Sequence, residues 1–491
     1  MEAKIFKDGT VITFNNVTQT IVVLSRASVL VVGDRIAAIA DEEEALSLPD
    51  GISSIESIDI AGKILAPGFI NTHVHSWQTV YRTLGPNVIL ANYFDWLSQI
   101  SPTAVKAFTP EDIYISSLEG YLEGLNAGVT SFVEHAHNNW DGAVVKPGYR
   151  AAVDSRTRVW WCYDIASRPD FPVEEQWGII SEIAAKISLA EATEAATGRV
   201  CLGLSLDGLS GSSFGDAILE IGVKAKQLGV QAFTMHHMGG PWPQGNSSPA
   251  KMGEQGLPDA GIPIIFSHAP FLTDEDMSAL REHDMFVSIT PESECHFGHG
   301  QVTGKVISDH VSLGLDTNWT FSGDMIGQAR LWLQTVRNNS YTKTLVEKEK
   351  LPNTNPMTVE QAFLLATRQG ARALRRDDIG VLQVGAKADL IVFNGDSPNM
   401  LGWSDPVAAV ILHANSGDVQ HVLVSGEFRK RDFELVVDVP GGWSSVRDRF
   451  VEAAQRIQAQ VKTPPSLPDR LWGVGELGDV EISTTVRNID G

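Results

Sequence analysis

The most informative segment of the chain is PGFINTHVHSWQ at residues 67–78, where an apolar run ends in two histidines one residue apart. Side chains alternate between the faces of a β-strand, so His73 and His75 share a face with Phe69 and Asn71. At this spacing the two Cα atoms lie about 6.6 Å apart, and both imidazoles can reach one ion. The segment therefore predicts a strand that carries the first half of a metal site.

Short apolar segments recur from residue 67 onward, with amphipathic segments between most of them. Strands are predicted near residues 68–75, 129–135, 157–164, 199–206, 229–236, 262–268, 285–290 and 311–316. Helices are predicted at 111–128, 272–283 and 324–338, whereas 238–260 is expected to be mostly loop. Eight strands that alternate with helices over about 250 residues are typical of a closed (β/α)₈ TIM barrel.

Both ends of the chain have strand patterns without this alternation. Such segments lie at 28–40, 54–68, 388–394, 409–414 and 419–428. We therefore predict an α/β fold in which a barrel of residues 67–380 is inserted in a small β-sandwich domain built from 1–66 and 381–440. Residues 441–491 are expected to form a C-terminal helix and a surface tail. The predicted apolar face of that helix consists of Val446, Phe450, Ala453, Ile457 and Val461.

Charge and cysteine content limit the classes of function. The chain has 491 residues, with 38 basic against 60 acidic side chains and a net charge of −22. Such a protein repels nucleic acid and anionic membranes, so neither is an expected partner. The three cysteines form no CxxC pair, which is typical of a reducing compartment. With no apolar leader and no long apolar span in the sequence, we expect a cytoplasmic protein.

Further metal-binding residue types stand at the ends of other predicted strands. In QAFTMHHMGG (231–240) the bulky Phe233 and Met235 should face the helices, which turns His236 inward and leaves His237 at the rim. His268 ends the strand IPIIFSH. In VSLGLDTNW (311–319) the same alternation directs Asp316 inward. Strand ends of a barrel converge on one mouth, where barrel active sites lie.

These segments together resemble the metal-dependent amidohydrolase superfamily, in particular its aminohydrolase and chlorohydrolase group, which includes cytosine deaminase-like and triazine hydrolase-like enzymes. The segments that carry the resemblance are PGFINTHVHSWQ, FSHAPFLTDEDMSAL, LGLDTNWTFSGDM and ALRRDDIGVLQVGAKADLIVFN. They spread over roughly residues 20–430.

The resemblance implies a single divalent metal ion held by His73, His75, His236 and Asp316. Zinc is the expected metal, with iron and manganese as alternatives. It also implies two catalytic residues: His268, which hydrogen-bonds the water or the developing oxyanion, and Asp316, which takes the proton of the water. Two-metal relatives carry a carboxylated lysine at the end of the fourth strand, and VCLGLSLDG (200–208) has none.

One position departs from the family pattern. Family deaminases carry HxxE on the fifth strand, and that glutamate protonates the leaving ring position. Here Gly239 takes the place of the glutamate, which argues against deamination of a purine, pyrimidine or triazine. Candidates for a replacement acid are Glu292, Glu294, His135 and His137. The alternative for each of them is a polar loop residue without a catalytic role.

Several residues just beyond the strand ends are candidates for substrate binding. The aromatic residues Trp77, Trp140, Trp319 and His296 suggest a flat or apolar substrate, and Gln78 follows His75 by three residues. The predicted substrate-binding residues are Trp77, Gln78, His137, His237, Glu294 and Trp319.

The sequence thus predicts a mononuclear hydrolase that uses metal-bound hydroxide on a non-peptide C–N bond of a cyclic or aromatic small molecule, such as an amide, lactam or amidine. One alternative keeps the site but changes the reaction to deamination, hydrolytic dehalogenation, elimination or decarboxylation. Another is a non-enzymatic scaffold with the same fold. The expected partner is a small-molecule substrate. A homodimer of two copies of this chain is the further possibility.

Overall fold

The protein is described by a computed structural model over residues 2–41, 46, 51–192, 199–207, 214–243, 248–300 and 303–483. Eight parallel strands pair in chain order to form a barrel. They are β6 (Phe69–Val74), β7 (Val129–Ala136), β8 (Arg158–Asp164), β9 (Val200–Ser205), β10 (Phe233–His237), β11 (Ile264–His268), β12 (Phe286–Ile289) and β13 (Val311–Leu313). A parallel bridge between Val74 and Asp316 brings the end of the last strand back to the first. The predicted barrel and its eight strands are confirmed.

Apolar side chains fill the barrel interior, one or two from each of six strands and one, Ala232, from just before a seventh. The interior cluster comprises Ile70, Val133, Trp160, Cys162, Cys201, Ala232, Ile265 and Phe286, together with Ala371, Ala373, Leu374 and Ile379. The last four residues lie in or just after α12 (Arg368–Ala373). Because this half of the interior is closed by packing, a ligand must enter from the other end, where the strands finish.

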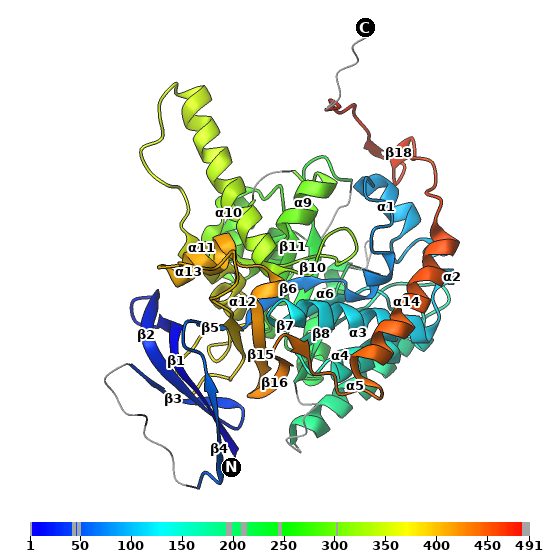
Figure 1. The fold of residues 1–491 in the computed structure, drawn as a ribbon. Coiled ribbons are helices and arrows are strands. Elements are labelled where there is room, and N and C mark those ends of the chain that lie inside the picture. The colour runs from blue at the N-terminus through cyan, green and yellow to red at the C-terminus, as the bar shows by residue number, and fades with distance from the viewer. Residues whose placement is uncertain are drawn as a thin grey trace, which may run out of the picture.

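Helices surround the barrel (Figure 1). The longer ones are α3 (Pro110–Asn126), α4 (Gly142–Asp154), α5 (Val173–Ala192), α6 (Phe214–Gln227), α8 (Asp274–Glu282), α10 (Met325–Thr342) and α11 (Val359–Ala366). Thr109 and Asp112 form a capping box at the start of α3, and Thr273 and Asp276 form another at α8. The three predicted helices are present. The segment expected to be loop contains the short α7 (Pro249–Glu254).

Short elements at the strand ends complete the mouth and the outer wall. They are η1 (Ser76–Tyr81), α1 (Leu90–Trp96), α2 (Pro102–Ala107), η2 (Leu257–Ala260), α9 (Pro291–Phe297), η3 (Thr303–Lys305), η4 (Ser308–His310) and the π-helical turn η5 (Lys343–Glu347). In Figure 1, α10 projects from the body of the molecule.

Strands from both chain ends form a second, mixed sheet, at the lower left of Figure 1. Its strands are β1 (Glu2–Asn15), β2 (Thr20–Val32), β3 (Arg35–Ala40), β4 (Ser54–Asp59), β5 (Ile64–Pro67), β14 (Leu390–Phe393), β15 (Val419–Val424), β16 (Glu427–Arg431) and β17 (Glu434–Leu435). The antiparallel pair of β5 and β14 joins the two ends. The prediction of a β-domain built from both ends is confirmed, whereas its residue boundaries stay a prediction.

One expected strand, at residues 409–414, is wrong. This segment continues α13 (Pro406–Ala408) as the π-helical turn η6 (Ala409–His413). Asp405 accepts hydrogen bonds from the backbone N–H groups of Val407 and Ala408, and Pro406 occupies the first helical position. Both are helix-start signals. A short apolar run does not by itself distinguish a strand from a buried helical turn.

The C-terminal helix α14 (Gly442–Val461) has the predicted face buried, from Val446 to Val461, and packs against α3 and α2. The chain then continues along the surface with the short pair β18 (Arg470–Leu471) and β19 (Gly475–Glu476). Among the described residues, no helix is both long enough and apolar enough to cross a membrane.

Candidate metal centre

The first barrel strand brings both of its histidines inward by a shift in register rather than by simple alternation. Pairing of β6 with β7 is irregular between Asn71 and Val74. Below the shift, Ile70 belongs to the barrel interior, and Thr72 shares hydrogen bonds of 2.7 and 2.8 Å with two serine hydroxyls of β12 and β13. Simple alternation would turn Ile70 and Thr72 away from His73 and toward the helices, and the structure differs from it here. His73 nevertheless faces the interior, because its Nδ1 lies 2.8 Å from Ser267 Oγ.

Four side chains meet at the mouth with the spacing of a tetrahedral metal site. Asp316 Oδ1 lies 3.3 Å from His73 Nε2 and 3.4 Å from His75 Nε2. His75 Nε2 lies 3.3 Å from His236 Nε2. A tetrahedral ion with bonds of about 2.1 Å keeps its ligand atoms roughly 3.4 Å apart. The four residues predicted from the sequence as metal ligands are thus brought together in one group.

Each histidine of this group has its other ring nitrogen occupied. His75 Nδ1 donates to the carbonyl oxygen of His135 at 2.9 Å, and His73 Nδ1 pairs with Ser267 Oγ. His236 Nδ1 contacts Asp207 Oδ2. Partners of this kind fix the ring orientation and direct Nε2 toward the other members of the group. His73 Nε2 is fully buried without a hydrogen-bond partner, which an ion at the centre of the group would supply.

Burial keeps most of these rings neutral, the form that binds metals. Burial lowers the pKa of His75 to about 3, and the pKa of His73 well below its usual value. For His236 burial acts in the same direction, but Asp207 more than offsets it and the pKa is raised. For Asp316 burial raises the pKa, but His268 and His75 lower it overall, so the group is a carboxylate. Three imidazoles and one carboxylate make a donor set suited to zinc.

His268 and Asp316 end their strands in the left-handed backbone region, with φ of +68° and +73°. Non-glycine residues adopt this region at a cost and are frequent at functional sites. His268 Nδ1 lies 3.0 Å from Thr290 Oγ1. Asp316 Oδ2 accepts a hydrogen bond from the hydroxyl of Ser293, while Oδ1 faces the two histidines of β6. The turn at His268 could not be read from strand alternation.

Two predicted substrate-binding residues lie directly behind the histidine pair. The ring of His137 stacks on the ring of His75, with centroids 3.8 Å apart. Trp77 is fully buried, and its Nε1 donates to His137 Nδ1 at 2.9 Å. Trp77 therefore lies beneath the mouth, where it packs on the edges of Phe108 and Trp140.

Gln78 and Trp319 lie together on the next part of the wall. The amide of Gln78 donates to the hydroxyl of Tyr93 at 2.7 Å. The ring of Tyr93 stacks on Trp319, with centroids 5.5 Å apart. Trp319 is buried and donates to the carbonyl oxygen of Leu84. Trp77 and Trp319 are thus both covered by neighbouring side chains, and their contact with a substrate stays a prediction.

His237 lies outside the group of candidate metal ligands, whereas Glu294 lies next to His268. His237 is buried, and neither of its ring nitrogens has a hydrogen-bond partner. Glu294 Oε1 accepts a hydrogen bond from Thr290 N and lies 3.8 Å from His268 Nδ1. Burial, with a contribution from Asp316, raises the pKa of Glu294 to about 8. Glu292 instead pairs with Gln328 of α10.

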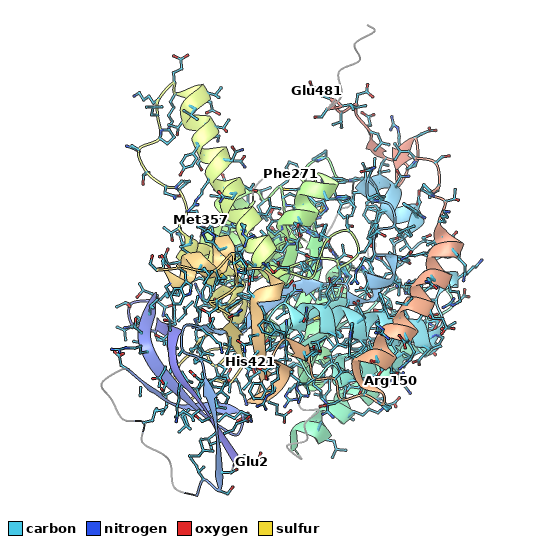
Figure 2. All side chains as sticks on the ribbon, in the orientation of Figure 1. Glu2, Arg150, Phe271, Met357, His421 and Glu481 are labelled. Carbon is cyan, nitrogen blue, oxygen red and sulfur yellow. The ribbon has the colours of Figure 1, made fainter. Side chains whose placement is uncertain are left out.

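Packing by Phe271 accounts for the glycine that replaces the family glutamate. Gly239 has a φ of +70°, and a Cβ there would lie 3.1 Å from the carbonyl oxygen of Phe271. A Cβ on Gly240 would lie 2.6 Å from the ring, and one on Gly300 would lie 2.5 Å from it. Figure 2 labels Phe271 at the barrel end near α9. The space next to the fifth strand is thus occupied by an aromatic side chain.

Sequence reasoning missed two residues of this region. Asp207 follows β9 and shares strand parity with Cys201 and Gly203, so the alternation that located Asp316 could have located it too. His299 follows α9, is 2 % exposed, and its ring lies 4.4 Å from that of His268. Burial lowers the pKa of His299 to about 4. It lies in a loop, where no periodicity could place it.

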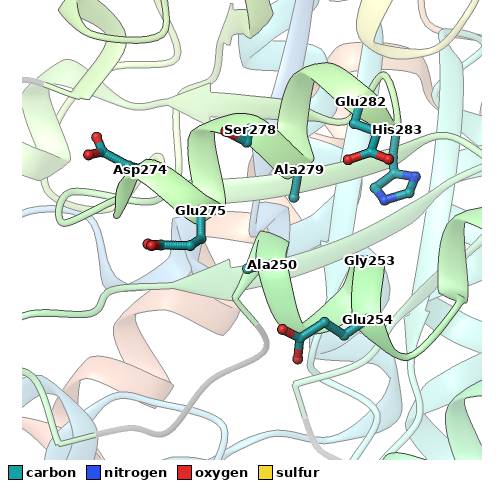
Figure 3. A pocket seen from close by; sticks show the side chains of 9 residues that line it. All are labelled: Ala250, Gly253, Glu254, Asp274, Glu275, Ser278, Ala279, Glu282 and His283. Atoms are coloured by element: carbon teal, nitrogen blue, oxygen red, sulfur yellow. The ribbon is translucent and has the colours of Figure 1, made fainter.

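A separate surface cavity lies between α7 and α8 (Figure 3). It is lined by Ala250, Gly253, Glu254, Asp274, Glu275, Ser278, Ala279, Glu282 and His283. None of the predicted site residues lines it, and we assign it no role.

Comparison with known proteins finds related sequences and structures. Residues 244–429 match the model of the amidohydrolase family. Over this segment the chain is similar to members of the amidohydrolase family. It is 24 % identical to a 5'-deoxyadenosine deaminase of Methanothermobacter thermautotrophicus, with 84 % of this chain and 91 % of that protein covered. It is 25 % identical to a 5-methylthioadenosine/S-adenosylhomocysteine deaminase of Acetivibrio thermocellus, with 77 % and 84 % covered.

Solved structures share the fold of this chain. A zinc-bound adenosine deaminase from Xanthomonas campestris has a TM-score of 0.71 at 18 % identity, with 93 % of this chain and 98 % of that chain covered. A zinc complex of atrazine chlorohydrolase from Arthrobacter aurescens also has a TM-score of 0.71 at 18 % identity, with 92 % and 100 % covered. These similarities support a hydrolase that acts on C–N bonds other than peptide bonds.

Proposed function

We propose that this amidohydrolase is a mononuclear metal enzyme that hydrolyses a non-peptide C–N bond of a cyclic or aromatic small molecule. The observation that carries the proposal is the group of His73, His75, His236 and Asp316, whose facing atoms have the separations of one tetrahedral ion. When bound there, a divalent ion such as zinc would lower the pKa of water enough to supply a nucleophile at neutral pH. Iron and manganese are the alternatives.

The chain's own residues then handle the protons. The Asp316 carboxylate takes the proton of the attacking water, since its pKa is held low and Oδ1 faces the histidine pair. Thr290 can hold His268 at Nδ1, which leaves Nε2 free to donate a hydrogen bond to the developing oxyanion. Burial lowers the pKa of His268 well below its usual value, so the ring acts as a neutral donor.

Protonation of the leaving nitrogen needs a second group, because Gly239 carries no side chain. Glu294 is our candidate for this proton donor. Its raised pKa, about 8, keeps the carboxyl group protonated at neutral pH, and it lies beside His268. Gln78, Trp77, His137, His237 and Trp319 are proposed to shape the substrate pocket or support its walls.

Deamination of an amino-substituted heterocycle is the second candidate, favoured by the names of the relatives. Mass spectrometry of products distinguishes the two reactions. Opening of an amide or lactam adds one water, whereas deamination replaces NH by O. We expect turnover in a panel of lactams, cyclic amides and aminated purines and triazines, together with about one metal per chain by elemental mass spectrometry. No metal after reconstitution with zinc, iron or manganese would contradict the proposal.

Three free cysteines, two of them buried, support a reducing, cytoplasmic location. The net charge of −22 argues against nucleic acid and anionic membrane partners. A homodimer stays a prediction, and sedimentation of the purified protein would test it.

A further inference from the structure

Asp207, at the end of the fourth barrel strand, contacts His236 through two separate hydrogen bonds. The backbone N–H of His236 donates to Oδ1 at 2.8 Å, and the ring nitrogen Nδ1 contacts Oδ2. One carboxylate thus holds both the backbone and the imidazole of the same residue. Nε2 of that imidazole is left to face His75 and the metal group.

His135 joins the same carboxylate to the first strand. Its Nε2 lies 3.1 Å from Asp207 Oδ2 and 2.5 Å from the hydroxyl of Ser205, while its Nδ1 lies 2.9 Å from Thr234 Oγ1. The carbonyl oxygen of His135 accepts the hydrogen bond from His75 Nδ1. Residues of β7 and β9 therefore orient two of the proposed ligands from behind.

We propose that Asp207 is a positioning residue that holds His236 in the orientation and tautomer needed to bind a single metal ion, with His135 fixing Asp207. The inference rests on the proposed metal site. A carboxylate behind a ligand histidine fixes the ring and raises its basicity, and removal of such a partner typically weakens metal binding about 10- to 100-fold. Asp207 stands at the strand end where two-metal relatives carry a bridging lysine, but here it faces the back of a ligand.

The competing arrangement is a second ion shared by His135, Asp207 and His236, whose ligand atoms also lie within 4.8 Å of one another. Direct contact between Asp207 Oδ2 and His236 Nδ1 argues against it, because two ligands of one ion keep roughly 3 Å or more between them. The contact fits a hydrogen bond between the imidazole and the carboxylate.

Zinc affinity tests the proposal without reference to activity. Zinc is titrated into the metal-depleted full-length protein in competition with a chromophoric chelator. We expect Asp207→Ala to weaken zinc binding about 10- to 100-fold, Asp207→Asn less, and Asp207→Glu to restore part of the affinity. With cobalt in place of zinc, the visible spectrum of Asp207→Ala should change, since the imidazole is no longer held.

Asp389→Asn is the matched control. Asp389 is a buried carboxylate paired with Arg158 at 3.2 Å, at the start of β8 and away from the metal group. We expect this variant to have a lower melting temperature and wild-type zinc affinity.

Wild-type affinity in Asp207→Ala, with zinc binding lost in His73→Ala, would overturn the inference and leave the metal site standing. Two zinc ions in the wild type, one of them lost in Asp207→Ala, would make Asp207 a ligand and also overturn it. No zinc binding in the wild type would overturn both.

Discussion

Two sides of the barrel mouth differ in how closely they follow the family pattern. On one side, which we call the ligand side, lie His73, His75, His236 and Asp316, the predicted metal ligands. On the other, which we call the variable side, lie the glycine pair at 239–240, the turn at 268–271 and the segment 291–300. The ligand side keeps every residue type that the family pattern implies. The variable side lacks the glutamate and carries Phe271 in its place.

The difference follows from what each side must do. An ion needs its ligand atoms at fixed separations, so a change in one ligand weakens metal binding. A leaving group needs only a proton donor within reach, and different residues can supply one from different elements. A ligand side that matches the family pattern beside a variable side that departs from it is what we expect when the metal chemistry stays and the substrate changes.

The largest expected effect is on the ligand side. Asp316→Asn keeps the size of the side chain but removes the proton acceptor, so kcat/KM should fall about 10³-fold or more. Measured alongside metal content, the loss should exceed any loss of metal. Full activity in this variant would mean that another group takes the proton of the water, and full function in both Asp316→Asn and His73→Ala would favour a non-enzymatic scaffold.

The next effect tests the variable side. Glu294→Gln removes the proposed proton donor without changing a metal ligand, and kcat should fall about 10²-fold with metal content unchanged.

The pKa of Glu294 is about 8, so the protonated form disappears as pH rises through that value. Wild-type kcat should therefore decline above pH 8.

The matched control is Glu292→Gln, because Glu292 is already engaged by Gln328. We expect near wild-type kcat in this variant. Equal losses in the Glu292 and Glu294 variants would contradict a specific role for Glu294.

The sequence predicted the ligand side well because strand alternation is a strong local rule. It placed His236 and Asp316 on the inward face, and the structure brings both into one group. The same rule failed in β6, where a shift between Asn71 and Val74 reverses the facing of Ile70 and Thr72. A bulge of this kind depends on pairing with a neighbouring strand and leaves no mark in the strand's own sequence.

The variable side was harder to predict because it consists of turns and loops. His299 approaches His268 from the loop after α9, and Phe271 covers the glycine pair from the loop after β11. Neither contact has a periodicity that a sequence could reveal. Asp207 is a different case, since it shares strand parity with the interior residue Cys201 and could have been predicted to face inward.

A smaller effect is expected when the family glutamate is put back. Gly239→Glu places a side chain at a φ of +70° and within 3.1 Å of the carbonyl oxygen of Phe271. We expect a loss of about 1–3 kcal/mol in the free energy of unfolding and no gain in deaminase activity. Gly239→Ala is the control, because it carries the same backbone strain without the carboxylate. A stable Gly239→Glu variant with new deaminase activity would show that the two sides of the mouth evolve independently.

The smallest effect returns to the ligand side, where Glu134 supports the turn after His75. Both of its carboxyl oxygens accept from the backbone N–H of Ser76, at 3.1 and 3.3 Å. Burial raises the pKa of Glu134 to about 8 in the folded state, from 4.5. A raised pKa stabilises the fold fully below pH 4.5, and this contribution is lost as pH rises to about 8.

Glu134→Gln removes that titration while keeping an acceptor for Ser76. Between pH 5 and pH 8 the wild type should lose stability by up to about 1 kcal/mol per pH unit more than the variant. Melting temperatures at several pH values, with zinc in constant excess, measure the difference. Buried Glu119 also has a raised pKa, about 7, mainly because of burial. Its titration adds a weaker dependence of stability on pH, which is present in the wild type and in Glu134→Gln alike. Parallel pH profiles would mean that Glu134 titrates alike in the folded and unfolded chains, and that the turn beneath His75 is more open to water than its contacts indicate.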